Sequence, residues 1–290
     1  MKKLLLMLVL LAVPLMAQPT PALKDAAAER RAKLMKAVPD GIMIIQSADR
    51  SQPDLLEFMV PDTEGHDFIY LAGIERANLP GSTLVINPRG ETYRQILYTS
   101  DDVERVKRLT GIEHVFPQSR FRDDLSSAIT DYRNLRITQL RFKPVASDIS
   151  RGLGLEGTKK VIYLNYPRFT NLNEPANPRF ALAARLREAS PEIDLRDSGE
   201  ILDRMRMIHD TYGLAQIRQA VRITGKGLME AMKAAKPGVT TGQVAATMDY
   251  IYRLNGAGGL GFPTGVSSVL RRRRSMRRRA RSARRIQVNT

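Results

Sequence analysis

The sequence predicts an α/β protein with a mixed sheet, followed by a pair of long helices. Short runs rich in β-branched residues, such as Ile42-Met43-Ile44-Ile45, alternate with stretches of helical length over the first two-thirds of the chain. From about residue 197 that alternation stops, and two long helical patterns follow. The hydrophobic content of 43% suffices for a buried core, and 290 residues suit two domains. We therefore expect two domains of different architecture.

The first part of the chain reads as strands alternating with helices. Residues 22–38 are rich in Ala, Lys, Arg and Glu and are expected to form a helix. The turn Pro39-Asp40-Gly41 separates it from a strand at 42–45, which is apolar enough to be buried on both faces. Further strands are expected at 67–71, 82–87, 95–99 and 160–164, and further helices at 102–110, 122–134 and 178–189. This order favours an α/β layer with a mixed sheet.

The second part predicts two helices whose apolar faces need a cover. After Asp210, one helix carries a single apolar stripe, made of Leu214, Ile217, Val221, Thr224 and Leu228. Lys236-Pro237-Gly238 should end this helix, and Thr241 is expected to cap the next one. The glycine-rich residues 255–259 end the second helix, and 260–262 are expected to begin a strand. Because two helices and an incomplete strand cannot bury both faces, further structure is expected to follow.

The N-terminus has the pattern of a signal peptide. Lys2 and Lys3 precede an unbroken apolar run from Leu4 to Val13, and Ala17 offers a small residue for cleavage. The run is shorter than the roughly 20 apolar residues that span a bilayer. We therefore expect residues 1–17 to direct export to the bacterial periplasm or medium, with no membrane attachment after cleavage. Because the chain has no cysteine, neither a lipoprotein anchor nor a disulfide can form.

The C-terminal residues 269–290 differ from everything before them. They contain ten arginines and no acidic residue, and they account for most of the formal net charge of +16. Three interpretations are open: an arm that binds nucleic acid or acidic lipid, a solvated extension, or the product of a shifted reading frame. We favour the shifted frame, because the run begins inside an expected strand rather than at a linker. The remaining chain is only mildly basic, so nucleic acid is not an expected partner.

Residues able to carry out chemistry are few and scattered. His66, His114 and His209 lie far apart, in no spacing that suits a zinc site. The acidic pairs Asp101-Asp102 and Asp123-Asp124 each open an expected helix, where stabilising the helix N-terminus explains them. No Ser–His–Asp arrangement can be argued. The glycines at 256–261 precede no helix and so make a poor phosphate site.

Several segments in order resemble one family. Residues 207–210 (MIHD), 217–220 (IRQA), 236–240 (KPGVT) and 261–268 (GFPTGVSS) are similar to the entry to the pita-bread metallopeptidase domain of Xaa-Pro aminopeptidases and prolidases. Glu29-Arg30-Arg31 with Leu34, and residues 66–74 (HDFIYLAGI), resemble the aminopeptidase P N-terminal domain. The resemblance runs from about Ala28 to Ser268. It implies a creatinase-type N-terminal α/β domain at 23–196 and the start of an incomplete pita-bread α+β domain at 197–268.

The resemblance also implies a chemistry for which this chain lacks residues. The family holds two divalent ions, expected to be manganese, with two Asp, one His and two Glu, all located after the strand to which 261–268 corresponds. In this chain Val269 stands where a glycine is expected, and no such ligands follow. We therefore expect no metal-binding and no catalytic residues. Phe262 corresponds to an aromatic residue that lines the pocket for the substrate's N-terminal residue, although a core aromatic on a central strand would fit equally.

The expected lineage is an exported metalloaminopeptidase that releases the N-terminal residue of peptides whose second residue is proline. The chain itself is expected to be inactive, because it carries only the start of the catalytic domain. Two alternatives stay open: a prolidase-type dipeptidase lineage, and an interaction module in which the N-terminal domain builds a homo-oligomer.

Overall fold

The computed structural model describes residues 21–38, 40–47, 65–74, 79–134, 143–154, 160–167 and 178–267. The expected signal peptide and the arginine-rich run therefore lie outside the described residues. The chain divides into two compact units, residues 1–212 and 213–290. The first unit retains α8, which lies beyond the boundary expected at residue 196. No helix in the described ranges is long and apolar enough to cross a membrane.

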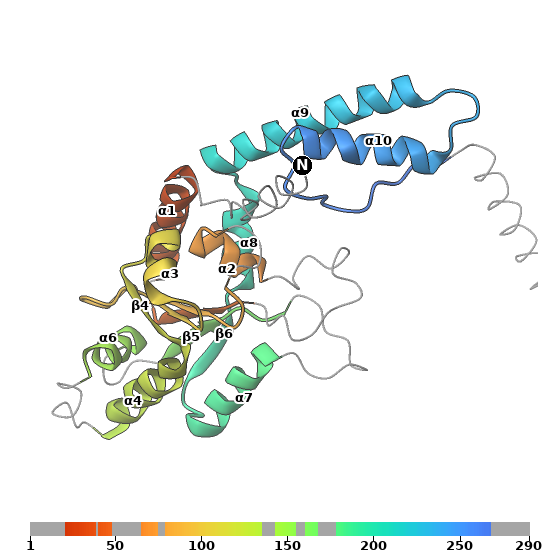
Figure 1. Cartoon of the computed structure of the whole chain (residues 1–290). Coiled ribbons are helices and arrows are strands. Elements are labelled where there is room, and N and C mark those ends of the chain that lie inside the picture. Colours follow the sequence, from red (N-terminus) through yellow and green to blue (C-terminus); the bar gives the residue numbers. More distant parts are fainter. Residues whose placement is uncertain are drawn as a thin grey trace, which may run out of the picture. The chain divides into compact units, whose positions relative to one another are not determined.

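The first unit is a six-stranded sheet with helices on both faces (Figure 1). The strands lie in the order β4-β3-β2-β1-β5-β6. β2 pairs antiparallel with β1 and β3, while the pairs β1–β5, β3–β4 and β5–β6 are parallel. The strands are β1 Ile42–Gln46, β2 Thr83–Ile86, β3 Gln95–Thr99, β4 His114–Pro117, β5 Val161–Leu164 and β6 Asp194–Asp197. The predicted α/β class with a mixed sheet is thus confirmed.

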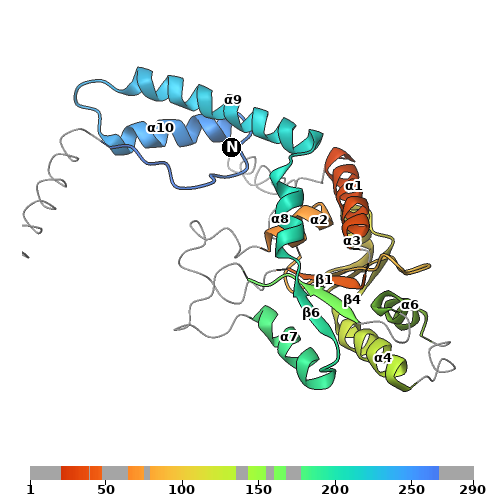
Figure 2. The ribbon, with the colours of Figure 1, turned by 180° about the vertical axis from the view of Figure 1, so that it is seen from behind.

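Two groups of helices cover the two faces of this sheet, as Figures 1 and 2 show from opposite sides. One group is α1 Pro21–Ala37, α2 His66–Ala72, α3 Val103–Thr110 and α8 Gly199–Met207. The other is α4 Phe121–Asn134, α6 Pro144–Leu153 and α7 Pro178–Ala189. β1 explains why both faces are covered: Ile42 and Ile44 pack into one core, and Met43 and Ile45 into the other. A strand buried on both faces reads as a continuous apolar run.

One expected strand is a helix. Residues 67–71 belong to α2, and the prediction of a strand there was wrong. Phe68, Leu71 and Ala72 form its buried face, which is helical spacing. Gly73, at a φ of 69°, ends the helix in the left-handed conformation that glycine adopts without strain.

Among the described residues, five elements have no counterpart in the sequence prediction: β4, the short 3-10 helix η1 Gln118–Arg120, α6, β6 and α8. β4 and β6 are the two edge strands of the sheet, and β6 (Asp-Leu-Arg-Asp) has one apolar residue. Strands this polar are formed by pairing with a neighbour rather than by a local pattern. The other expected strands and helices of the first unit are present within one or two residues of the predicted bounds.

The second unit contains α9 Thr211–Ala234, whose first two residues still belong to the first unit, and α10 Thr241–Leu254. Both helices were predicted, but Thr240 rather than Thr241 caps α10. The expected strand at 260–262 is absent from the described part of the chain, where these residues form a bend and irregular backbone. This prediction was therefore wrong.

Candidate functional site

α9 and α10 pack closely through a glycine. A side chain at Gly227 would place its Cβ 2.2 Å from Cε1 of Tyr252, so only glycine admits the tyrosine ring at this distance. Gly227 and Ala231, one turn apart, are the buried residues of α9. Two small residues at this spacing let the second helix approach closely.

The start of α10 is determined by a capping box. The Thr240 hydroxyl accepts from the backbone N–H of Gln243 at 3.2 Å, and the Thr240 N–H donates to Oε1 of Gln243 at 2.8 Å. Gly238, at a φ of 88°, turns the chain between the helices. These contacts satisfy backbone donors that a helix N-terminus otherwise leaves unpaired. The two helices are thereby held as an antiparallel hairpin.

A groove of about 500 Å³ runs between α9, α10 and the segment after α10. Residues 256–262, with Thr264 and Gly265, form one side, and Tyr252 and Met248 of α10 contribute to another. The Thr264 hydroxyl donates to Oδ1 of Asp249, which ties this segment back to α10. Phe262 lines the groove but is 74% exposed, so it is not the core aromatic on a strand that was its alternative interpretation.

The apolar stripe of α9 faces solvent in the described structure. Leu214, Ile217, Val221 and Leu228 are between 40% and 64% exposed. All the exposed large hydrophobic residues of the described chain lie between Met207 and Phe262. Among the described residues of the first unit, only Met207 and Ile208, close to its C-terminal end, are of this kind. Exposed apolar surface concentrated in one place is typical of a face that meets another surface.

A comparison with protein families shows which family this part of the chain resembles. Residues 215–279 match the sequence pattern of metallopeptidase family M24. We call residues 215–279, for their similarity to this family, the M24 segment. The match begins in α9 and extends past Ser268 into the arginine-rich run, so the domain boundary expected at Ser268 stays a prediction. No curated protein matches the chain.

Solved structures with a similar fold include aminopeptidases P. A structure assigned to aminopeptidase P from Bacillus anthracis has a TM-score of 0.59 at 17% identity, over 80% of this chain and 52% of that one. Aminopeptidase PepP from Pseudomonas aeruginosa (TM-score 0.53, 18% identity) and proline aminopeptidase P II from Yersinia pestis (0.51, 18%) each match over 81% of this chain and 50% of theirs. The chain thus spans about half the length of these structures. The suspected family resemblance is confirmed by both comparisons.

The residues of the M24 segment do not fit a metal centre. Between residues 213 and 267 the sequence has two carboxylates, Glu230 and Asp249, and no histidine or cysteine. Glu230 accepts from Lys233 at 2.7 Å, and Asp249 accepts from Thr264. Across the described residues, no group of three or more His, Cys, Asp or Glu side chains is placed to hold an ion. Two adjacent ions need more oxygen and nitrogen ligands than this segment offers.

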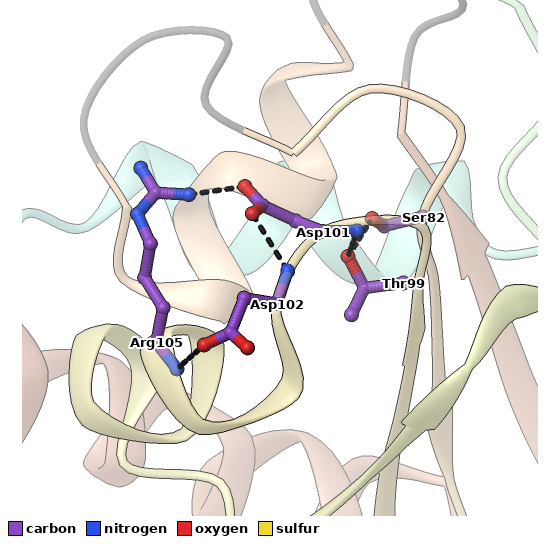
Figure 3. A network of polar contacts seen from close by, with 5 residues as sticks. All are labelled: Ser82, Thr99, Asp101, Asp102 and Arg105. Atoms are coloured by element: carbon purple, nitrogen blue, oxygen red, sulfur yellow. Dashed lines mark hydrogen bonds and ion pairs between the residues drawn. The ribbon is translucent and has the colours of Figure 1, made fainter.

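The acidic pairs of the first unit make contacts within the fold, and Asp102 caps a helix as expected. Asp102 caps α3 by accepting from the Arg105 N–H at 2.7 Å, and Asp101 pairs with the Arg105 guanidinium (Figure 3). Thr99 links this turn to β2, because its hydroxyl accepts from Ser82 at 3.0 Å. Asp124 accepts from the Tyr98 hydroxyl at 3.0 Å.

The three histidines lie apart in the first unit. His66 is the first residue of α2, and His114 in β4 contacts the ring of Tyr93 at 4.6 Å between centroids. His209 is exposed between α8 and α9. The structure therefore brings none of them together.

Proposed function

We propose that the chain belongs to the lineage of metal-dependent Xaa-Pro aminopeptidases and is not itself an active peptidase. The M24 match at residues 215–279 carries this proposal, because it directly follows a first unit with the aminopeptidase P fold. The substrates of the lineage would be peptides with proline at the second position, and its cofactor would be a pair of divalent ions, manganese in our proposal. A prolidase-type lineage is the alternative on the same evidence. Export by residues 1–17 is part of the proposal.

The inactivity of this chain is proposed from its carboxylates. Glu230 and Asp249 are the acids of the described M24 segment, and each is already bonded. Without a metal-bound water or a paired general base, no residue there can activate water for peptide hydrolysis. Phe262 is proposed to correspond to a residue that contacts the substrate's N-terminal side chain. Its exposed position on the groove is compatible with that role.

An activity assay tests the proposal directly. The purified chain is incubated with an Xaa-Pro peptide and Mn²⁺, with the P. aeruginosa aminopeptidase as the positive control. We expect no release of the N-terminal residue above the buffer blank. Turnover that requires metal and persists through repurification would show that an active site has been overlooked.

Reading the DNA beyond codon 268 in all three frames tests the lineage separately. We expect a second frame to encode two Asp, one His and two Glu in metallopeptidase order. If no frame encodes such ligands, the arginine-rich run is a genuine extension and the proposed frame shift is wrong.

A second function is favoured by the exposed stripe of α9. Leu214, Ile217, Val221 and Leu228 are about half exposed, and burying the exposed half of each would stabilise an assembly by roughly 1 kcal/mol. We propose that the chain self-associates through this face. The original expectation that the N-terminal domain mediates oligomerisation stays an alternative.

Light scattering coupled to size-exclusion chromatography tests this association. We expect a mass above the 32.5 kDa of one chain, and a return to the monomer mass for Val221→Glu. Gln219→Glu adds the same charge on another side of α9 and is the control. A monomer mass for the unmodified chain at all concentrations would rule out self-association.

A further inference from the structure

A cavity of about 540 Å³ lies in the first unit between α4 and α7, remote in sequence from the M24 segment. The lining residues recur in pairs about one helical turn apart, from Phe121 to Thr130 of α4 and from Ala181 to Ser190 at the end of α7. Both helices lie on the same face of the sheet (Figures 1 and 2). The cavity is therefore a trough between two helices with the sheet beneath. We call it the α4–α7 trough.

The floor and the rim of the trough differ in chemistry. Phe121, Leu125 and Ile129 are 3%, 5% and 8% exposed and form one apolar row, which Leu186 of α7 continues on the other side. One position further along α4, the exposed Arg122, Ser126 and Thr130 make a polar rim. An apolar floor of this volume with a few polar groups at its edge is typical of small-molecule sites.

The ends of the trough hold buried polar atoms without a partner. Nε2 of Gln118 donates to the Thr83 hydroxyl at 3.1 Å, but its carbonyl Oε1 is buried and has no donor among the described residues. At the other end lies Ser190, which is 1% exposed. Its hydroxyl has no hydrogen-bond partner among the described residues. A buried polar atom that makes no hydrogen bond costs roughly 1–3 kcal/mol. A ligand group that bonded there would recover part of this energy.

The trough also lies where open α/β sheets bind ligands. Gln46, the last residue of β1, lines it, and Gln118 directly follows β4. β1 is the strand at which the chain order reverses, since β2 to β4 lie on one side of it and β5 and β6 on the other. Crevices at the carboxyl ends of strands around such a reversal are the general binding position of these sheets.

The charge at the rim indicates an anionic ligand. Arg122 lies in the first turn of α4, and no carboxylate of the described residues pairs with it. Arg185 lines the opposite helix and pairs with Glu188 at 2.7 Å, both being exposed. The neighbouring Asp124 already accepts from Tyr98 and Arg120. An arginine without a carboxylate partner is a ready donor for a ligand's carboxylate.

We propose that the α4–α7 trough binds the carboxyl-terminal apolar residue of a short peptide. The apolar side chain would lie on the Phe121–Leu125–Ile129 row, and the carboxylate would accept from Arg122. The adjoining amide N–H would donate to Oε1 of Gln118 once that side chain turns toward the trough, which supplies the missing hydrogen bond. Each of the three features of the trough thus meets one group of the ligand. This site is independent of metal chemistry in the M24 segment.

Ligand-observed NMR titration of the full chain tests the proposal with three probes. N-acetyl-L-leucine has all three groups, N-acetyl-L-leucinamide lacks the carboxylate, and acetate lacks the apolar body and the N–H. We expect saturable binding of N-acetyl-L-leucine and at least roughly tenfold weaker binding of the other two. The leucinamide loses a charged hydrogen bond, and acetate loses the burial of an apolar side chain; each contributes about that factor or more. A longer probe, N-acetyl-Ala-Ala-Leu, distinguishes a peptide's carboxyl end from a free acylated amino acid as the ligand. Binding of this longer probe supports a peptide end as the ligand. If N-acetyl-L-leucine binds but the longer probe does not, the ligand is a free acylated amino acid and the proposed peptide is wrong.

Three variants test whether N-acetyl-L-leucine binds in the α4–α7 trough. Arg122→Gln should weaken N-acetyl-L-leucine binding roughly tenfold. Arg187→Gln lies on α7 but outside the trough and should leave binding unchanged. Ser126→Trp, at an exposed rim position, should fill the trough and abolish binding while the circular dichroism spectrum is retained. No saturable binding to the unmodified chain, or binding that Arg122→Gln and Ser126→Trp leave unchanged, would overturn the proposal.

Discussion

At the scale of single residues, two glycines two positions apart in α9 have opposite surroundings. A Cβ at Gly225 would have no heavy atom within 4 Å, whereas one at Gly227 would collide with the Tyr252 ring. Glycine in a helix interior costs roughly 0.5–1 kcal/mol relative to alanine. The conformational cost is therefore the same at both positions, and only the packing distinguishes them.

Alanine at these two positions should change the stability of the second unit in opposite directions. Gly225→Ala should stabilise it by about 0.5–1 kcal/mol through helix propensity. Gly227→Ala should destabilise it, by about 1–3 kcal/mol, because the new methyl group forces α9 and α10 apart. Hydrogen exchange of the α10 amides measures both changes, and equal protection in the two variants would show that the helices do not pack as described.

Tyr98 should make the first unit sensitive to alkaline pH. Burial, and secondarily the neighbouring Asp124 carboxylate, raise the pKa of this phenol well above its usual value. A raised folded-state pKa contributes stability that is complete below about pH 10, the unfolded value, and is lost as the pH rises further. We expect Tyr98→Phe to be about 1 kcal/mol less stable at pH 7, because Asp124 loses a donor. Urea unfolding from pH 8 to 11 should show a steeper decline for the unmodified chain than for this variant.

At the scale of elements, α8 is held to the first unit by an ion pair with α2. Nη1 of Arg206 lies 3.0 Å from Oδ1 of Asp67, whose side chain is 2% exposed. Arg204, on the same helix, pairs with Glu200 at 2.5 Å where both side chains are 77% exposed. Arg30 of α1 pairs with Asp210 at 2.6 Å just beyond α8. The pairs of Arg206 with Asp67 and of Arg30 with Asp210 explain why the first compact unit extends past residue 196.

The two arginines of α8 should differ in their contribution to stability. Arg206→Met leaves the buried Asp67 carboxylate with fewer donors and should cost about 1–3 kcal/mol, a value reduced because Arg206 is partly exposed. Arg204→Met removes an exposed pair and should cost less than about 0.5 kcal/mol. Urea unfolding of both variants checks this difference. Equal losses would mean that the Asp67 pair adds nothing beyond a surface contact.

At the scale of the whole molecule, the two units differ in how completely they bury their apolar residues. The first unit has a core on each face of its sheet. In the second, the α9 stripe and Phe262 are exposed. Burying the exposed part of each such side chain would contribute roughly 1 kcal/mol, and several together approach the lower end of the roughly 5–15 kcal/mol stability of a domain. The second unit should therefore open at a lower free energy than the first.

Limited trypsin digestion should detect this difference. Arg196 lies in β6 and bonds to Asp194 and Tyr163, so it should resist cleavage. Arg218 and Arg222 are exposed on α9 and should be cut first among the described residues. Mass spectrometry of the early fragments, apart from cuts in the arginine-rich run, checks the order. Early cleavage after Arg196 with α9 intact would contradict it.

The sequence by itself determined the α/β class, the positions of β1, β3 and α7, and the resemblance that the M24 match confirms. These features depend on local patterns, since a continuous β-branched run or a 3.6-residue period is visible without knowing its neighbours. The same holds for Asp102, whose role as a helix cap depends on residues within one turn. The prediction for Phe262 as a substrate contact comes from the resemblance alone and stays a prediction.

Only the tertiary structure decided which polar segments are strands and where side chains converge. His66–Ala72 has the composition of a strand, but packing of Phe68 and Leu71 into one core makes it a helix. β6 is a strand because β5 pairs with it, a contact between residues more than thirty positions apart. The α4–α7 trough needs two helices more than forty residues apart in sequence to share one face of a sheet. Hydrogen bonds and burial between such distant residues have no local pattern, so the tertiary structure alone decides them.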